Sequence, residues 1–216
     1  LVNRINNEFS NDIKSGYLEV FILTGSKKLN KKIELIKKYS QTKIYYDNEK
    51  NIPLRILNFV NKKKFDFILV VDGDDILCSV EGMRKLVNYM NKSKDVFVKT
   101  RGYPFGMNSL ALKTKFIKSC KNIKKYKIMD TGWTRLFEDK KKIKFIDKVY
   151  KKSKKLRFTL DYKEDLTFFR SIINSNTNIV KAKDQKIISG VFKNKFYKHN
   201  FKVIKKYWEN FYKKKN

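Results

Sequence analysis

Residues Phe67–Leu77, FILVVDGDDIL, join an uninterrupted apolar run to a tight group of three aspartates. The run Phe67–Val71 is rich in β-branched residues, is too short for a buried helix, and is typical of a parallel strand covered on both faces. It ends in Asp72-Gly73-Asp74-Asp75, and in open α/β sheets ligands bind at the carboxyl ends of the strands. Carboxylates crowded there are costly unless a cation neutralises them. The stretch therefore predicts either a Mg²⁺ site or an acidic turn that leads into the next helix.

On both sides of this stretch, apolar runs alternate with segments of helical periodicity. Beside the run from Phe67, the expected strands are Tyr17–Thr24, Lys43–Tyr46, Val96–Lys99, Ser109–Leu112, Trp133–Phe137, Ile143–Ile146 and Lys155–Thr159. The expected helices are Leu1–Ile13, Leu29–Tyr39, Ile52–Val60, Ser79–Asn91, Thr114–Ser119, Asp161–Ile173, Asp184–Phe192 and Phe201–Tyr212. This alternation predicts an α/β fold, namely a Rossmann-like, mostly parallel, doubly wound sheet. The chain enters on a helix, whereas in such folds a first strand and its loop commonly bind nucleotide phosphates.

The formal net charge is +31 at pH 7, which by itself would suggest an anionic partner. Only seven of the 52 basic residues are arginine, and the lysines are spread over every expected element. Recognition of phosphate favours the bidentate guanidinium of arginine. We therefore expect no specific nucleic-acid partner, although nucleotides and anionic polymers would be attracted to the chain.

The sequence shows no sign of a membrane or of a secretory route. No apolar run approaches the length of a membrane span, and no signal peptide is visible. Cys78 and Cys120 form no metal-ligand pattern and are expected to be free thiols in a reducing compartment. We therefore expect a cytoplasmic protein without a membrane partner.

A second acidic cluster lies in Leu156–Leu166, LRFTLDYKEDL. Glu164 and Asp165 fall in the first turn of an expected helix, where carboxylates stabilise the helix dipole by about 0.3–1 kcal/mol. Asp161 is different, because it follows an expected strand, as Asp74 does. If those two strands are neighbours, the two carboxylates could converge on one Mg²⁺ ion.

Five segments, in this order along the chain, carry a family resemblance. They are LTGSKKLNKKI at 23–33, NIPLRIL at 51–57, VVDGDDIL at 70–77, RGYPFGMNSLAL at 101–112 and RFTLDYKEDL at 157–166. Together they resemble the cytidylyltransferases that activate acidic sugars, whose R-x-T-x-D-x-x-E-D-L signature the last segment matches. That family includes acylneuraminate and 3-deoxy-manno-octulosonate cytidylyltransferases and the spore coat polysaccharide biosynthesis protein SpsF group, which this sequence resembles most closely in style.

The sequence departs from the family pattern at several places. The family's opening strand and its P-A-R-x-x-S-x-R-x-x-x-K loop, which grips CTP, have no counterpart, so the chain looks N-terminally truncated. Ile76 replaces the usual proline, and Asn108 stands where many relatives have an acid. Residues 130–133 occupy the region of the H-V-T-x-Y-I stretch of typical SpsF relatives. These changes fall in the part that would select the sugar.

The resemblance implies transfer of CMP from CTP to an acidic or related sugar, with release of pyrophosphate, in surface polysaccharide biosynthesis. It implies that Asp74 and Asp161 are the catalytic residues and hold Mg²⁺. The residues implied in nucleotide binding are Thr24, Ser26, Arg55 and Asp72, and those implied in sugar binding are Arg101, Gly106 and Asn108.

The resemblance also implies how the chain is organised. Residues 1–216 would form a single nucleotidyltransferase-like domain. Within it, residues 121–155 would be a variable insertion on the sugar side or at an interface, and residues 184–216 a helical extension. A homodimer is the expected assembly.

Two other functions remain compatible with the sequence. Asp72-Gly73-Asp74 also satisfies the D-x-D pattern with which glycosyltransferases of the same broad fold hold a metal and a nucleotide-sugar diphosphate. The LDYKEDL segment at 160–166 argues against that alternative. The absent phosphate loop favours a third interpretation, in which the chain is a non-catalytic remnant or a basic binding module.

Overall fold

The computed structural model describes residues 1–213 except 39, 41, 138–142, 149 and 151–154. The first half contains α1 (Val2–Glu8), α2 (Ser10–Lys14), β1 (Phe21–Thr24), the 3₁₀-helix η1 (Lys31–Lys38), β2 (Lys43–Tyr46), α3 (Ile52–Lys62), β3 (Phe67–Val70) and α4 (Val80–Lys92). The second half contains β4 (Phe97–Arg101), β5 (Leu110–Lys113), α5 (Thr114–Ser119), η2 (Lys121–Lys125), η3 (Trp133–Leu136), β6 (Ile143–Asp147), α6 (Lys163–Asn174), α7 (Asp184–Lys193), η6 (Phe196–His199) and α8 (Val203–Lys213).

The described strands form two sheets. β1 pairs in parallel with β2, and the larger sheet has the order β3-β5-β4-β6. In the larger sheet β5 runs antiparallel to β3 and β4, whereas β4 and β6 are parallel. The α/β, Rossmann-like fold expected from the sequence is confirmed. Residues of β1 and of β3 line the same cavity, so the two sheets lie side by side in one layer with that cavity between them.

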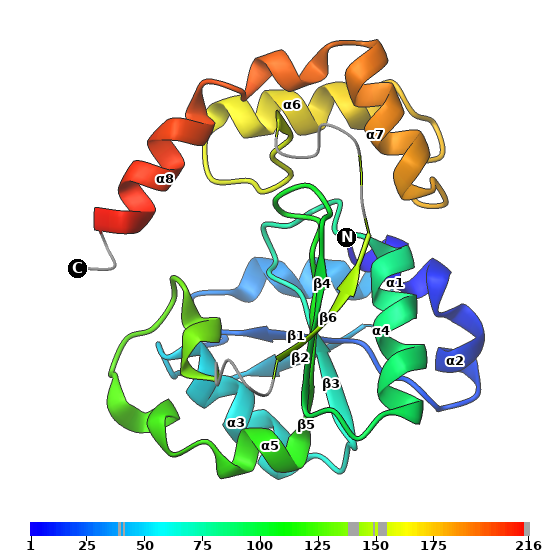
Figure 1. The fold of residues 1–216 in the computed structure, drawn as a ribbon. Helices are drawn as coiled ribbons and strands as arrows, with labels where there is room; N and C mark the ends of the chain where they lie inside the picture. The colour runs from blue at the N-terminus through cyan, green and yellow to red at the C-terminus, as the bar shows by residue number, and fades with distance from the viewer. Residues whose placement is uncertain (39, 41, 138–142, 149, 151–154, 214–216) are drawn as a thin grey trace.

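Helices cover both faces of this layer (Figure 1). α1, α2 and α4 lie on one side and α3 and α5 on the other, while α6, α7 and α8 lie beyond the loops at one end of the strands. The side chain of Asn51 accepts a hydrogen bond from the N–H of Leu54 at 3.0 Å and thereby starts α3. Ser79 starts α4 in the same way, through Gly82 N–H at 2.7 Å, as the sequence predicted.

Arg4 joins the first helix to the start of α7 and to the segment before it. From α1, its Nη1 donates to the carbonyl oxygens of Ile179 at 2.7 Å and Ala182 at 2.9 Å. Its Nη2 lies 3.4 Å from the carboxylate of Asp184, the first residue of α7. Arg4 and Asp184 are both buried, so this ion pair joins the first helix to the C-terminal helices inside the protein.

Several of the expected elements differ in the structure. Leu1–Ile13 forms two helices, α1 and α2, which are separated at Phe9. Trp133–Phe137 is not a strand; Trp133 and Phe137 are both buried at a spacing of four residues, and the chain forms the helical turn η3 to bury both. Lys155–Thr159 makes only an isolated bridge from Arg157 to Phe105, because its buried side chains pack between a loop and α6 instead of pairing in a ladder. The expected helix Leu29–Tyr39 forms as the 3₁₀-helix η1.

Some of the predictions fall on positions that are not described. Tyr39, the last residue of one expected helix, is among them, as are residues 138–142, 149 and 151–154 of the expected insertion at 121–155 and residues 214–216 of the expected C-terminal extension. Within the described residues, no helix combines the length and apolarity that a bilayer crossing requires. Cys78 and Cys120 are free thiols, as expected.

Candidate functional site

Three segments that are far apart in the sequence meet at the loop end of β3. Leu160 N–H donates to the carbonyl oxygen of Asp74 at 3.0 Å, and Phe158 N–H donates to that of Phe105 at 2.7 Å. The loop after β3, the loop after β4 and the segment before α6 are therefore joined by main-chain hydrogen bonds. This places the acidic stretch that follows β3 beside the acidic stretch that precedes α6.

Asp74 and Asp161 are neighbours in this arrangement. Their charges repel each other strongly enough to contribute to a raised pKa of Asp74. Thr159, a buried residue of the same segment, interacts with the carboxylates of Asp74 and Asp75 and opposes the rise in the pKa of both. Thr159 thus links the two acidic stretches through side chains as well as through the main chain.

The aspartates after β3 are held in a state that favours a proton or a cation. Loss of hydration raises the pKa of Asp72, Asp74 and Asp75, with Asp75 reaching about 8. Repulsion from Asp74 raises the pKa of Asp72 and Asp75 further. A hydrogen bond from Trp133 Nε1 to Asp72 Oδ1, at 3.1 Å, opposes the shift at Asp72 because it stabilises the ionised carboxylate.

A buried ion pair holds Asp161 in place. Arg157 pairs with Asp161 through Nη2 and lies 3.2 Å from Asp165 through Nε. The carboxylate of Asp165 also accepts the N–H groups of Asp161 and Tyr162, each at 3.0 Å, and the side-chain amide of Asn200 at 2.9 Å. Asp165 therefore caps α6, as expected, and fixes the backbone on which Asp161 stands.

The residues expected to bind the nucleotide lie in two places. Thr24 is buried at the end of β1, and Ser26 begins the turn that follows, where its Oγ accepts a hydrogen bond from Leu29 N–H at 3.4 Å. Arg55 lies on α3 and lines the same cavity as Asp72. Its Nη2 donates to the carbonyl oxygen of Glu49 at 2.6 Å, while its Nε is buried without a hydrogen-bond partner among the described residues.

The residues expected to bind the sugar are engaged within the protein. Arg101 forms a bidentate, solvent-exposed pair with Asp147, at 2.7 and 2.9 Å. Gly106 has φ of +84°, and an added Cβ would lie 2.4 Å from the carbonyl group of Phe158. The amide of Asn108 donates to two carbonyl oxygens of its own loop at 3.4 Å, and its Oδ1 is buried without a partner among the described residues.

The C-terminal helix covers one side of the site. The ring of Tyr207 lies 4.2 Å from Cζ of Arg157, and Phe105 packs against Tyr207 and Trp208 at ring distances of 5.0 and 5.4 Å. Burial raises the pKa of Tyr207 to about 12, and the charge of Asp161 adds to the shift. α8 is therefore part of the surroundings of the acidic cluster.

Four residues of the site were not selected by the sequence analysis: Trp133, Arg157, Thr159 and Tyr207. Arg157 and Thr159 lie inside the segment that matches R-x-T-x-D, so the signature itself contained the signal for them. Trp133 is buried, like a residue that only packs in the core. Nothing in the sequence indicates its hydrogen bond to Asp72. Tyr207 reaches the site only through the docking of α8.

No protein-family model matches the sequence, and no curated protein does. Among solved structures, a cytidylyltransferase from Leptospira borgpetersenii serovar Hardjo-bovis (strain JB197) is similar, with a TM-score of 0.73 and 18% sequence identity. The match covers 92% of this chain and 85% of that one. This chain shares the fold of that solved structure. The expected fold class and the observed topology therefore agree with a solved structure over nearly the whole chain.

The carboxylates at the loop end of β3 suit a hard divalent cation. Mg²⁺ binds oxygen ligands and is commonly held by one or two carboxylates together with substrate phosphates. Asp74 and Asp161 offer such oxygens, and a cation between them would relieve the repulsion that raises the pKa of Asp74. Within the described ranges, no group of three or more His, Cys, Asp or Glu side chains is arranged to hold a metal ion.

Proposed function

We propose that this protein is a cytidylyltransferase that transfers CMP from CTP to an acidic or related sugar and releases pyrophosphate. The observation that carries the proposal is the meeting of Asp74 and Asp161 at the loop end of a fold shared with a solved cytidylyltransferase. The resemblance to the SpsF group further suggests a role in surface polysaccharide biosynthesis. A cytoplasmic homodimer is the assembly that the resemblance suggests.

In this reaction the protein itself forms no covalent bond to the substrates. A sugar oxygen attacks the α-phosphate of CTP, the bond to the bridging oxygen breaks, and pyrophosphate leaves. Such a reaction depends mainly on positioning and on neutralising the negative charge of the phosphates. Asp74 and Asp161 would hold Mg²⁺, which supplies that positive charge when it is bound. Arg157 and Thr159 would act as positioning residues, because Arg157 pairs with Asp161 and Thr159 interacts with the carboxylate of Asp74.

The proposed binding residues divide between the two substrates. Arg55 and Asp72 line one cavity and would contact the nucleotide, with Thr24 and Ser26 at the neighbouring strand end. Asn108 would contact the sugar through Oδ1, a buried acceptor without a partner among the described residues. Gly106 would shape the sugar loop, because its backbone lies against Phe158. Arg101 would bind sugar only after releasing Asp147.

The test is release of pyrophosphate by the gene product, including any residues that its gene encodes upstream of Leu1. CTP, Mg²⁺ and a panel of acidic and amino sugars are supplied to the wild type, Asp74→Asn, Asp161→Asn and the control Asp66→Asn. Asp66 is an exposed carboxylate at the opposite end of β3. We expect release that depends on one class of sugar, survives Asp66→Asn, and falls at least about 100-fold in the other two variants. Release that is insensitive to both site substitutions would contradict the assignment.

A glycosyltransferase is the second candidate, because Asp72 and Asp74 are close enough for the charge of Asp74 to raise the pKa of Asp72. That arrangement suits a D-x-D metal site. Product analysis separates the two functions. Transfer of sugar from a nucleotide-sugar to an acceptor, with no pyrophosphate formed from CTP, would select the glycosyltransferase. Salt-sensitive binding of RNA without any turnover would select a basic binding module.

A further inference from the structure

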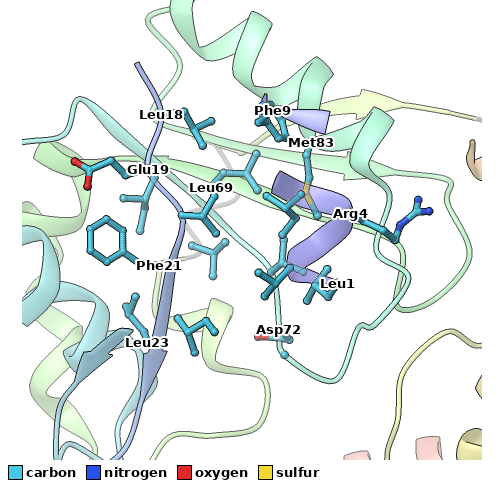
Figure 2. Close-up of a pocket in the computed structure, with 18 of the residues that line it drawn as sticks. Leu1, Arg4, Phe9, Leu18, Glu19, Phe21, Leu23, Leu69, Asp72 and Met83 are labelled. Carbon is cyan, nitrogen blue, oxygen red and sulfur yellow. The ribbon is translucent and has the colours of Figure 1, made fainter. Parts of the chain in front are cut away.

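The acidic site has two borders of different character. At one border Asp72 lies at the end of a cavity of about 1220 Å³ between β1 and β3, as Figure 2 shows. At the other border Asp161 lies beside the C-terminal helix α8, and neither is among the described residues that line the cavity. Figure 1 shows α8 at the end of the arch of helices that crosses the loop end of the strands. The site is therefore open to a cavity on one side and covered by a helix on the other.

Tyr207 is the residue of α8 that lies on the ion pair of the site. The centre of its ring is 4.2 Å from Cζ of Arg157, closer than the ring of Phe105 at 5.4 Å or that of Tyr162 at 5.6 Å. A guanidinium is attracted to the face of an aromatic ring at such distances, most strongly where water is excluded. The side chain of Arg157 is only 2% exposed, so its contact with Tyr207 belongs to the stronger kind.

The guanidinium of Arg157 is not held by hydrogen bonds on every side. Its Nε and Nη2 bind the carboxylates of Asp165 and Asp161, whereas Nη1 is buried and makes no hydrogen bond with the described residues. On the side of Nη1, the orientation of the group must therefore depend on packing. The aromatic rings around Arg157 supply that packing, and Tyr207 contributes most because its ring is the nearest of the three.

Arg157 in turn orients the carboxylate proposed to hold the metal. Its Nη2 pairs with Oδ2 of Asp161, which leaves Oδ1 of the same carboxylate for a cation. The side chain of Asp161 is 35% exposed, so it is accessible to a cation and would be free to rotate if Arg157 did not hold it. A side chain that is already oriented loses less conformational freedom when it binds. The contact of Tyr207 with Arg157 should therefore strengthen the binding of a cation by Asp161.

Polar contacts dock α8 on the same segment of the chain. Asn200, which is buried just before the helix, donates to the carbonyl oxygen of Arg157 at 3.0 Å and to Oδ1 of Asp165 at 2.9 Å. Within the helix, the side-chain amide of Asn210 donates to the hydroxyl of Tyr162 at 3.2 Å. The helix is thus attached to the segment that contains the proposed metal ligand, and a change in its docking would be felt there.

We propose that Tyr207 is a positioning residue for the metal: its ring fixes the guanidinium of Arg157, and that guanidinium aligns Asp161 with a divalent cation. The C-terminal helix thereby sets the metal affinity of the site. Such coupling is reciprocal, because a docked helix that favours the bound cation is favoured by the cation to the same extent. Metal binding should therefore hold α8 in its docked position. This role rests on the proposed function, because it takes Asp161 as a metal ligand.

Binding of Mn²⁺, followed by electron paramagnetic resonance, tests this role without nucleotide or sugar. Mn²⁺ prefers the same oxygen ligands as Mg²⁺. Tyr207→Leu removes the ring, and we expect the dissociation constant of Mn²⁺ to rise about five- to thirtyfold. Tyr207→Phe keeps the ring and should bind Mn²⁺ within about twofold of wild type. The control Tyr197→Leu removes a tyrosine that packs on Phe192 of α7, and it should also bind Mn²⁺ as wild type does.

Hydrogen exchange of the main-chain amides of α8 measures the reciprocal effect. In wild type, saturating Mn²⁺ should slow the exchange of amides 207–210 at least about fivefold, because the bound cation opposes undocking of the helix. In Tyr207→Leu the same addition should have little effect. Asp161→Asn should abolish both the binding of Mn²⁺ and the protection of α8, which verifies that the cation is at this site.

Several outcomes would overturn the role of Tyr207. One is equal affinity of wild type and Tyr207→Leu for Mn²⁺. Another is an equal loss of affinity in Tyr207→Phe and Tyr207→Leu, because the hydroxyl and not the ring would then be responsible. Binding of Mn²⁺ that survives Asp161→Asn, or no binding by wild type, would also overturn it.

Circular dichroism shows whether each variant is folded. The exchange measurement on wild type needs no variant, so α8 amides that do not respond to Mn²⁺ would overturn the role even if Tyr207→Leu did not fold. Failure of the proposed function has a different signature. Wild type would then release no pyrophosphate from CTP with any sugar, while its binding of Mn²⁺ would still weaken in Tyr207→Leu.

Discussion

The guanidinium of Arg157 and the carboxylate of Asp165 form a fully buried ion pair, with Nε 3.2 Å from Oδ1. Asp165 lies four residues after Asp161, which also pairs with Arg157. One guanidinium thus joins the residue that caps α6 to the residue proposed to hold the metal. The stability of this region and the geometry of the site therefore depend on the same group.

Replacement of Asp165 should be strongly destabilising. Asp165→Asn leaves the buried charge of Arg157 without its main partner, and breaking a buried pair from one side commonly costs about 3–5 kcal/mol. Urea denaturation followed by circular dichroism measures the loss of unfolding free energy. Glu164→Gln, an exposed neighbour in the same helical turn, is the matched control and should change stability by no more than the roughly 1 kcal/mol of a helix-dipole interaction. Equal effects of the two substitutions would show that the ion pair of Arg157 and Asp165 does not stabilise the fold.

Asp74 should matter for activity without supporting the fold. Loss of hydration and the charge of Asp161 raise the pKa of Asp74, so its ionised form is unfavourable in the folded protein. Asp74→Asn should lower turnover at least about 100-fold. The urea concentration at the midpoint of unfolding, measured at pH 8, should stay unchanged or rise. A marked fall in that midpoint would show instead that the carboxylate has a structural role.

Trp133 should tune the acidity of Asp72. Its indole N–H stabilises the ionised form of Asp72, so Trp133→Phe should raise the pKa of Asp72 further. Carbon-detected NMR titration of the aspartate carboxyl groups measures the change. Trp208→Phe removes the other tryptophan and is the control, because Trp208 packs on Phe105. An unchanged titration of Asp72 in Trp133→Phe would mean that the hydrogen bond is not maintained in solution.

Two glycines should respond oppositely to the same substitution. At Gly106 a Cβ would meet the carbonyl of Phe158 at 2.4 Å, and the positive φ is unfavourable for alanine, so Gly106→Ala should lose more than about 2 kcal/mol. At Gly190, within α7, no atom lies within 4 Å of the new Cβ. Gly190→Ala should gain about 0.5–1 kcal/mol through helix propensity. Thermal unfolding of both variants tests the pair, and a stable Gly106→Ala protein would contradict the described loop.

Asp184 should make stability fall as the pH rises. Burial raises its pKa to about 6, although a hydrogen bond from Ser79 and the charge of Arg4 oppose the shift. The folded protein then holds a proton that the unfolded chain releases near pH 4. The contribution of this group to the unfolding free energy is therefore greatest below about pH 4 and is lost by about pH 6. Wild type should show this decline relative to Asp184→Asn in urea titrations between pH 4 and 7.

Asp95 serves as a control, because its contribution to the unfolding free energy should change with pH in the opposite direction. The hydroxyl of Tyr89 hydrogen bonds to its carboxylate and lowers the pKa of Asp95. Its contribution is present above the ordinary aspartate pKa and is lost as the pH falls, so Asp95→Asn should remove a slope of the other sign. Parallel curves for all three proteins would contradict both assignments.

The sequence predicted those elements whose local signals agree with their tertiary environment. β3 is an apolar run bounded by charges, and α4 has its cap at Ser79, so the amino-acid pattern alone locates both. Trp133–Phe137 was predicted wrongly, because a strand propensity was preferred to the four-residue spacing that buries Trp133 and Phe137 together. Here tertiary packing decides the local conformation.

For the site, the sequence could indicate the carboxylates but not their surroundings. Asp74 and Asp161 stand out because each follows an apolar stretch in a matching motif. The long-range contacts that complete the site, such as Trp133 to Asp72 and Tyr207 over Arg157, join residues 61 and 50 positions apart. No local pattern encodes such contacts, because they depend on how whole helices and loops dock.

The contacts of Arg4 with α7 and with the segment before it have a consequence for synthesis of the protein on the ribosome. The partners of Arg4 are the carbonyls of Ile179 and Ala182 and the carboxylate of Asp184, all translated about 175 residues after it. Until those residues emerge, α1 carries a guanidinium that has no native partner for burial. The first helix can pack on α4 earlier, through Glu8 and Arg84, but its packing is complete only when nearly the whole chain has been made. A nascent chain of this protein should accordingly resemble a late-folding client, dependent on chaperones until the last helices leave the exit tunnel.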